Sequence, residues 1–354
     1  MDTQLFHSAK KTRLFIIAIA LCFIVPLFLI ASYVWAPIYT GDSSTFVYID
    51  SDDNIDSVYD KVSEIASPRS LRAFCTIARH MHYADHIKSG RYEVKSGVKA
   101  LELVRTLRNG QQTPLKLVIP EVRTTGDMAR ELGKKLMADS LAWISALSDP
   151  AICDSLYTDT VNIIALFIPN TYEVYCNTSV SRFLERMKTE HDRFWNEERL
   201  HKAHTLDLTP FEVGTLASIV DEETANKAEK PMVARMYYNR LNYGKLYGGG
   251  SMLLQADPTV KFALKQFGLR RIYNQMLTVD SPYNTYKYKG LPPGPIKVPS
   301  TDGIDAVLNM PEHDYLYMCA KEDFSGTHNF AHTYAEHQQN ARKYINALNE
   351  RGIK

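Results

Sequence analysis

The stretch Thr209-Pro-Phe-Glu-Val-Gly-Thr-Leu-Ala-Ser-Ile-Val-Asp-Glu-Glu-Thr224 carries the strongest local signal in the chain, and it predicts a helix. Thr209 has a side chain suited to the N-cap, and Pro210 suits the first helical position. Glu212 stands where its carboxylate can bond back to the cap residue, which completes a capping box. We therefore expect a helix that begins at about residue 209.

One side of this predicted helix is apolar, and Glu223 lies on that side. At about 100° per residue, five apolar side chains share one arc: Val213, Leu216, Ala217, Ile219 and Val220. Glu223 falls inside the arc, whereas Asp221 and Glu222 fall outside it and are expected to matter little for chemistry. Burial raises the pKa of a carboxyl group, as a general acid at neutral pH requires. The alternative is a half-exposed Glu223 paired with a Lys or Arg.

The bulk composition is that of a globular protein and gives no sign of a nucleic-acid partner. The chain has 354 residues, of which 45% are hydrophobic and 23% are charged, and its formal net charge is +1. No concentrated basic stripe is present. The length suggests about two domains.

The N-terminal region predicts a membrane anchor. Residues 14–36 form a run of 23 residues without a charge, long enough to cross a hydrocarbon core of about 30 Å. Lys10, Lys11 and Arg13 precede the run, so residues 1–13 should form a cytoplasmic stub. A cleaved signal peptide is the alternative, but its apolar core is shorter and no small-x-small site follows. The prediction is a single-pass protein of the inner (cytoplasmic) membrane, with the part of the chain after residue 37 outside.

Five cysteines are present, and their spacing favours neither zinc nor thioredoxin-like chemistry. Cys22 falls in the predicted anchor, which leaves Cys75, Cys153, Cys176 and Cys319 without a C-x-x-C pair. An oxidising compartment would permit disulfides, but four buried, unpaired thiols are at least as consistent with the sequence.

Beyond the anchor, the hydrophobic periodicity predicts an α+β protein in two parts. Residues 45–119 read as strand, two helices, strand, helix and strand, a small α+β module. Its acidic side chains fall in loops or on solvent faces, so we expect this part to position ligand without doing chemistry. Residues 120–354 read as a mixed α+β domain that contains Glu223. Gly248-Gly-Gly-Ser251 is a flexible loop by composition, either a lid or a tolerated insertion.

The loops after residue 240 are rich in groups that suit a polyhydroxylated ligand. Amides and carboxylates can bond to sugar hydroxyls, and Tyr faces can stack on sugar rings. Each motif, taken singly, could do no more than form a turn in the backbone. The relevant segments are Leu254-Gln-Ala-Asp-Pro-Thr-Val260, Tyr283-Asn-Thr-Tyr286, Gly290-Leu-Pro-Pro-Gly-Pro-Ile296 and His328-Asn-Phe-Ala-His-Thr-Tyr-Ala-Glu-His337.

Together with Leu216-Ala-Ser-Ile-Val-Asp-Glu-Glu-Thr224 and Asn239-Arg-Leu241, these segments resemble the YceG-like (MltG) family of membrane-anchored endolytic murein transglycosylases. They occur in the family's order over the last 140 or so residues. Phe167-Ile-Pro-Asn-Thr-Tyr172 resembles a further family element, with Asn170 in place of Asp. The resemblance makes residues 45–119 a LysM-like subdomain and residues 120–354 a YceG-like catalytic domain.

The chain departs from the family pattern in three places. Asp221-Glu-Glu-Thr224 stands where Glu-Lys-Glu-Thr is frequent, which leaves the last Glu in place. About seven extra residues lie between Gly244 and Gln255. Thr327-His328 replaces the usual Gly-His, so a substrate loop could be set differently.

The resemblance implies cleavage of MurNAc–GlcNAc β-1,4 bonds within peptidoglycan strands, giving 1,6-anhydro-MurNAc ends and terminating or trimming nascent glycan. Glu223 corresponds to the family's catalytic glutamate, and no cofactor or metal is implied. Peptidoglycan strands and the cytoplasmic membrane are the implied partners, with cell-wall synthases as candidates. Residues expected to hold the glycan are Gln255, Asp257, Asn284, Tyr286 and His328.

Two other functions remain open from the residues alone. Glu223 and Asp257 could serve as the two carboxylates of a hydrolase. The chain could also be a non-catalytic, membrane-anchored scaffold that binds glycan. A zinc site at His332-Thr-Tyr-Ala-Glu-His337 is disfavoured, because this run is one residue too long for H-x-x-E-H.

The predicted topology can be tested in spheroplasts. Because the basic residues precede the apolar run, protease added outside should digest the part of the chain after Pro37 while the anchor is retained. A mature N-terminus near residue 37, or protection of the domain, would show that the predicted anchor is wrong.

Overall fold

The computed structural model describes residues 24–25, 35–269 and 271–352. The predicted stub and most of the predicted anchor, residues 1–13 and 14–36, therefore lie outside the described residues. Within the described ranges, no helix combines the length and the apolar character needed to cross a membrane. The remainder is a mixture of helices and small sheets, so the predicted α+β class is confirmed.

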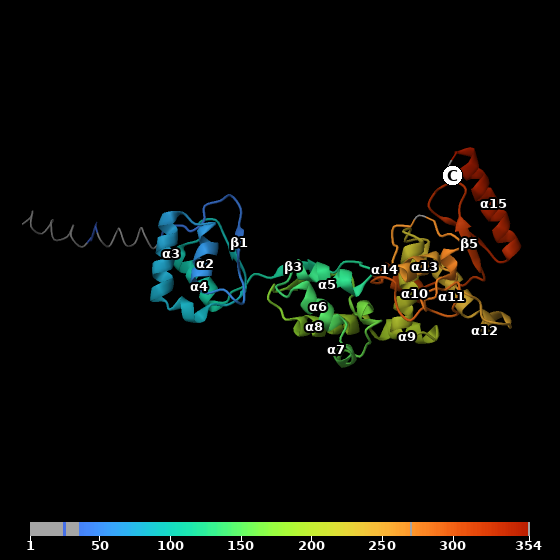
Figure 1. The fold of residues 1–354 in the computed structure, drawn as a ribbon, viewed down its shortest axis with the longest axis horizontal. Helices are drawn as coiled ribbons and strands as arrows, with labels where there is room; N and C mark the ends of the chain where they lie inside the picture. The colour runs from blue at the N-terminus through green and yellow to red at the C-terminus, as the bar shows by residue number, and fades with distance from the viewer. Residues whose placement is uncertain (1–23, 26–34, 270, 353–354) are drawn as a thin grey trace, which may run out of the picture. The chain divides into compact units, whose positions relative to one another are not determined.

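The chain divides into two compact units (Figure 1). The first ends at Lys116 and also includes Glu173–Thr178, and the second comprises Leu117–Tyr172 and Ser179–Lys354. Strands β3 (Leu115–Val118) and β4 (Thr171–Val174) form a two-stranded sheet within which the chain passes from one unit to the other. The functions predicted for residues 45–119 and 120–354 stay predictions.

The first unit has the predicted order of strand, two helices and strand. Strands β1 (Thr45–Ile49) and β2 (Gly90–Val94) pair antiparallel, with Val47 opposite Tyr92. Helices α2 (Ile55–Ser63), α3 (Pro68–His80) and α4 (Ala100–Asn109) pack with them around one core, and a 3-10 turn, η1 (Tyr83–His86), precedes β2. Gly110 has φ +68°, the left-handed conformation that ends α4 at low steric cost.

The second unit begins with a series of helices that precede the predicted Glu223 helix in the chain. They are α5 (Thr125–Gly133), α6 (Ser140–Leu147), α7 (Pro150–Ser155), η2 (Ile163–Leu166), α8 (Val180–Phe194) and α9 (Glu197–Thr205).

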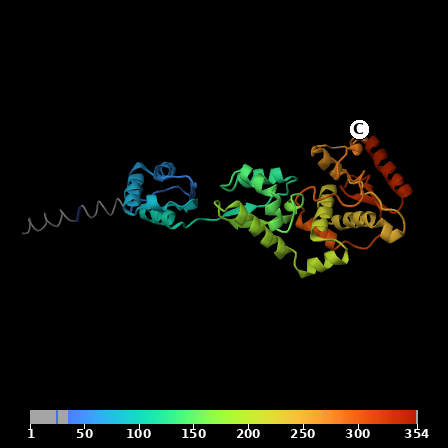
Figure 2. The ribbon, with the colours of Figure 1, turned by 60° about the horizontal axis from the view of Figure 1, so that its bottom comes forward.

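The remaining elements of this unit follow α9 in the chain, and several of them carry residues that line the predicted site. They are α10 (Pro210–Glu223), α11 (Lys230–Leu241), α12 (Tyr243–Tyr247), α13 (Asp257–Leu264), η3 (Met276–Thr278), α14 (Thr301–Leu308), β5 (Tyr317–Ala320), β6 (His328–Ala331) and α15 (Tyr334–Glu350). Strands β5 and β6 pair antiparallel, and α15 packs against both (Figure 2). The Gly248–Ser251 loop is exposed and follows α12.

Helix α10 is the centre of this unit. Its capping box forms as predicted, with Glu212 accepting from the backbone of Thr209. Every residue from Val213 to Val220 is buried, because α9, α11, α13, α14 and η2 all contact the helix. The sequence predicts an apolar stripe, whereas the structure has a helix buried on all sides.

Asp221 falls outside the predicted apolar arc, yet its side chain is buried in the structure. Its side chain is 2% exposed and forms an ion pair with buried Lys230 of α11. The backbone and hydroxyl of Ser300, the N-cap of α14, also donate to its carboxylate at 2.7 Å. A Cβ on Gly303 would lie 2.5 Å from its Oδ1, so α14 can approach only through a glycine. Asp221 thus ties α10 to α11 and α14.

We predict that Lys230→Met lowers the free energy of unfolding by about 3–5 kcal/mol, because it leaves the Asp221 charge buried and unpaired. Urea denaturation measures the loss. Lys227→Met is the matched control, since the Lys227–Asp302 pair is exposed, is screened by solvent and should contribute little to stability. Equal losses in the two variants would contradict the assignment.

Candidate active site

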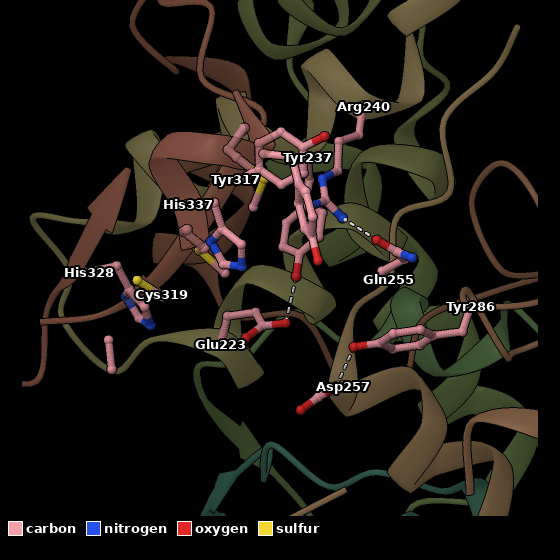
Figure 3. A pocket seen from close by; sticks show the side chains of 14 residues that line it. Glu223, Tyr237, Arg240, Gln255, Asp257, Tyr286, Tyr317, Cys319, His328 and His337 are labelled. Atoms are coloured by element: carbon pink, nitrogen blue, oxygen red, sulfur yellow. Dashed lines mark hydrogen bonds between the residues drawn. The ribbon is translucent and has the colours of Figure 1, made fainter. Parts of the chain in front are cut away.

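Glu223 is the last residue of α10, and the chain leaves the helix immediately after it. Thr224 is extended, with φ −142° and ψ 132°, and its N–H donates to Val220 as the helix closes. Glu223 lines a pocket of about 310 Å³ together with residues from α11, α13, the β5–β6 hairpin and α15 (Figure 3). The predicted acid therefore lies in a cavity that could receive a ligand.

The pocket shifts Glu223 toward its protonated form. Burial raises the pKa of its carboxyl group to about 7, and the negative charge of Asp257 acts in the same direction. A hydrogen bond from Tyr237 and the positive charge of Lys261 act in the opposite direction. The result is a carboxyl group that can give and take a proton near neutral pH, as predicted from its place on the helix.

Tyr237 is a site residue that no motif in the sequence singles out. Its hydroxyl donates to Oε1 of Glu223 at 2.6 Å, and the residue is fully buried on α11 (Figure 3). Burial and the neighbouring Glu223 raise the pKa of Tyr237, so the hydroxyl keeps its proton. The contact between α10 and α11 that creates this bond has no local signature in the sequence.

Gln255 reaches the pocket through an unusual backbone conformation. Its φ is +52°, in the left-handed region, and its N–H donates to Thr285. Arg240, buried on α11, donates to the carbonyl of Leu254 at 2.6 Å and lies 3.5 Å from Oε1 of Gln255 (Figure 3). Arg240 thus holds the segment that presents the amide.

Asp257 and Tyr286 meet on another side of the pocket. The hydroxyl of Tyr286 donates to Oδ1 of Asp257 at 2.6 Å (Figure 3). Asp257 lies in the first turn of α13, immediately before Pro258. There a carboxylate interacts favourably with the helix N-terminus.

Asn284 does not line the pocket. Its side chain is fully buried, its amide donates to the carbonyls of Leu277 and Val279 at 2.8 Å, and its oxygen accepts from the backbone of Tyr286. This geometry favours a role in shaping the loop that carries Tyr286 over the predicted contact with glycan.

His328 lines the pocket from β6 and contacts a residue that the sequence analysis missed. Glu229, buried just before α11, accepts hydrogen bonds from both the backbone and the ring of His328. The two residues are 99 positions apart, so only the fold reveals the pair.

The residues His332–His337, considered above as a zinc site, make other interactions. Glu336 completes the capping box of α15 with Thr333, and it also accepts from the backbone of His332. His332 pairs with Asp314. In the described part of the chain, no group of three His, Cys, Asp or Glu side chains is arranged to hold a metal ion. Cys75, Cys153, Cys176 and Cys319 are free thiols; Cys153 and Cys176 are buried as expected, whereas Cys75 and Cys319 are only half-buried.

Comparison with known proteins agrees with the resemblance. The model of the YceG-like family matches residues 47–343. A Bacillus subtilis protein named endolytic murein transglycosylase is 40% identical over 137 residues, covering 39% of this chain and 35% of that protein. A Streptococcus pneumoniae protein of the same name is 26% identical over 305 residues, covering 77% of this chain and 53% of that protein. The chain thus spans about half or less of the length of these curated relatives.

A solved structure shares the fold. The crystal structure of a yceG-like protein from Listeria monocytogenes superposes with a TM-score of 0.54 at 24% identity, covering 84% of this chain and 99% of that one.

We predict that Tyr237→Phe raises the pKa of Glu223 further, because it removes a hydrogen bond that favours the charged form. Titration of the glutamate carboxyl carbons by NMR measures the change. Tyr238→Phe is the matched control, since its hydroxyl donates to Leu206 and does not contact Glu223. An unchanged titration in Tyr237→Phe would show that the bond does not tune the acid.

Proposed function

Because the chain belongs to the YceG-like family, we propose that it is an endolytic lytic transglycosylase acting on peptidoglycan. The reaction is cleavage of the β-1,4 bond between MurNAc and GlcNAc inside a glycan strand, leaving a 1,6-anhydro-MurNAc end. The names of the curated relatives support this activity.

One observation carries the proposal. Glu223 lies at the closed end of a buried helix, inside the pocket, with the pKa of its carboxyl group raised to about 7. Asp221 and Glu222, its neighbours, are held in ion pairs with Lys230 and Arg123. A non-catalytic scaffold would not require such a carboxyl group.

In the first step, protonated Glu223 donates its proton to the glycosidic oxygen. The bond from that oxygen to C1 of MurNAc breaks as an oxocarbenium-like state develops, and the GlcNAc side leaves with a new hydroxyl. The glutamate is then a carboxylate, and the hydroxyl of Tyr237 stabilises it at 2.6 Å.

In the second step, the C6 hydroxyl of the same MurNAc attacks C1. Its proton passes to the Glu223 carboxylate, which restores the acid for the next turnover. No water enters the products, and one carboxyl group performs both proton transfers.

The proposal includes the part of the chain before the catalytic unit. Residues 14–36 would anchor the protein in the cytoplasmic membrane, with residues 1–13 inside and the catalytic unit outside. Residues 45–119, with their strand–helix–helix–strand order, would position glycan as a LysM-like subdomain. Cell-wall synthases are candidate partners.

A hydrolase remains the second candidate, because Asp257 lines the same pocket and raises the pKa of Glu223. In that reaction Asp257 would activate a water molecule, and the product would carry a reducing MurNAc end. Its carboxylate is, however, engaged by the Tyr286 hydroxyl at 2.6 Å, which favours an electrostatic or glycan-holding role.

We predict that Glu223→Gln lowers the cleavage rate by about 10²–10⁴-fold, because glutamine keeps the shape and has no transferable proton. In the wild-type protein, kcat/KM should fall as the pH rises through about 7, since the acid must be protonated in the free enzyme. Rates come from digestion of purified glycan strands. Glu222→Gln is the neighbouring control, and near wild-type rates for Glu223→Gln would refute the proposal.

The products separate the two candidates. Transglycosylation gives internal fragments whose MurNAc ends are lighter by one water, about 18 Da, than hydrolytic ends. Digestion in ¹⁸O-labelled water should leave those ends unlabelled. The Asp257→Asn variant should be less active, and its product ends should also be unlabelled. A majority of labelled reducing ends would decide for the hydrolase.

A further inference from the structure

Glu229 is a buried carboxylate beside the pocket that the mechanism above does not use. Its side chain is 8% exposed, and its Oε1 accepts from the backbone N–H of His328 at 2.6 Å. Its Oε2 accepts from Nδ1 of the same residue at 2.9 Å. The carboxylate therefore accepts hydrogen bonds from both the main chain and the ring of His328 on β6.

The same carboxylate also reaches the residue next to the acid. The hydroxyl of buried Thr224 donates to Oε2 of Glu229 at 3.0 Å, and it accepts from the backbone of Asn226 at 3.1 Å. Glu229 thus links the turn that follows Glu223 to the strand that carries His328.

This contact decides which nitrogen of His328 bears the proton. An ionised carboxylate accepts hydrogen bonds and has none to donate, so Nδ1 must carry a hydrogen. In a neutral imidazole the other nitrogen, Nε2, is then an acceptor. Within the described residues Nε2 has no hydrogen-bond partner, and His328 lines the pocket.

We infer that Glu229 is a positioning residue that fixes the ring of His328 so that Nε2 accepts a hydrogen bond from a hydroxyl or acetamido N–H of the glycan. The inference rests on the proposed function for the identity of the ligand. Figure 3 shows Glu223 between His328 on one side and Asp257 with Tyr286 on the other. A glycan held by His328 would therefore be held beside the acid.

The variant Glu229→Gln changes this arrangement with little change of shape. Its amide can donate to Nδ1, which moves the ring proton to Nε2 and turns the acceptor into a donor. We expect KM for soluble glycan strands to rise about tenfold, as for the loss of one good hydrogen bond, while kcat changes less than about twofold.

Glu322→Gln is the matched control. Glu322 accepts from the amide of Asn329 at 2.7 Å, so it also braces the β5–β6 hairpin, one residue from His328, without touching the ring. A variant that only loosens the hairpin would raise KM equally at Glu322 and Glu229, and equal effects would overturn the inference.

A double-mutant cycle tests whether Glu229 acts through His328. His328→Phe removes the acceptor, and adding Glu229→Gln should then raise KM by less than about twofold further. If the increases in KM caused by the two substitutions multiply in the double variant, the two residues act independently, and the inference is overturned.

The ¹⁵N NMR shifts of the His328 ring report which nitrogen is protonated and need no turnover. The wild-type protein should carry the proton on Nδ1, and Glu229→Gln should shift it toward Nε2. A wild-type ring protonated on Nε2 alone would overturn the inference even if Glu229→Gln fails to fold. If the wild-type protein binds glycan strands without cleaving them, the proposed function fails. The inference about Glu229 is then tested by binding, where Glu229→Gln should raise the Kd for the strands about tenfold.

Discussion

The site depends on one carboxyl group at the end of a helix whose central part is buried. Eight consecutive residues of α10, Val213–Val220, are buried, so neighbouring elements hold the helix that ends at Glu223. Burial and the Asp257 charge favour the neutral acid, as does the negative end of the helix dipole. The Tyr237 hydroxyl favours the carboxylate. The balance places the pKa near 7, where one group can serve as acid and then as base.

Three consecutive acidic residues end this helix, and their partners give them different roles. Asp221 is buried against Lys230 and Ser300, where it locks α10 to its neighbours. Glu222 is half-buried and pairs with Arg123 at 2.7 Å. Glu223 has a hydroxyl partner and, in the part of the chain that the structure describes, no basic side chain within salt-bridge distance. Its charge is therefore not held in place, and its proton remains available for transfer.

The sequence predicted those features that are local or that follow from shared motifs. The capping box at Thr209 depends on four adjacent residues, and it forms. Gln255, Asp257, Tyr286 and His328 line one pocket with Glu223. Features that depend on packing between distant segments were not predictable. Asp221 is buried because α14 approaches through Gly303, Tyr237 faces Glu223 because α11 folds back on α10, and Glu229 meets β6 across 99 residues. Asn284 shares a motif with Tyr286, yet its amide donates to a backbone carbonyl of the loop and does not face the pocket.

The C-terminal hairpin is as much a part of the active centre as the buried helix. Arg240 of α11 donates to Leu316 at 2.6 Å, just before β5, and Glu229 holds β6. Both anchors start from the segment that follows Glu223 and end on the hairpin that lines the pocket with Tyr317 and His328. A shift of α11 would therefore move Tyr237, which tunes the acid, together with the strands that meet the ligand. Acid strength and ligand position are coupled through one helix, so neither can be adjusted by local changes in the loop sequences alone.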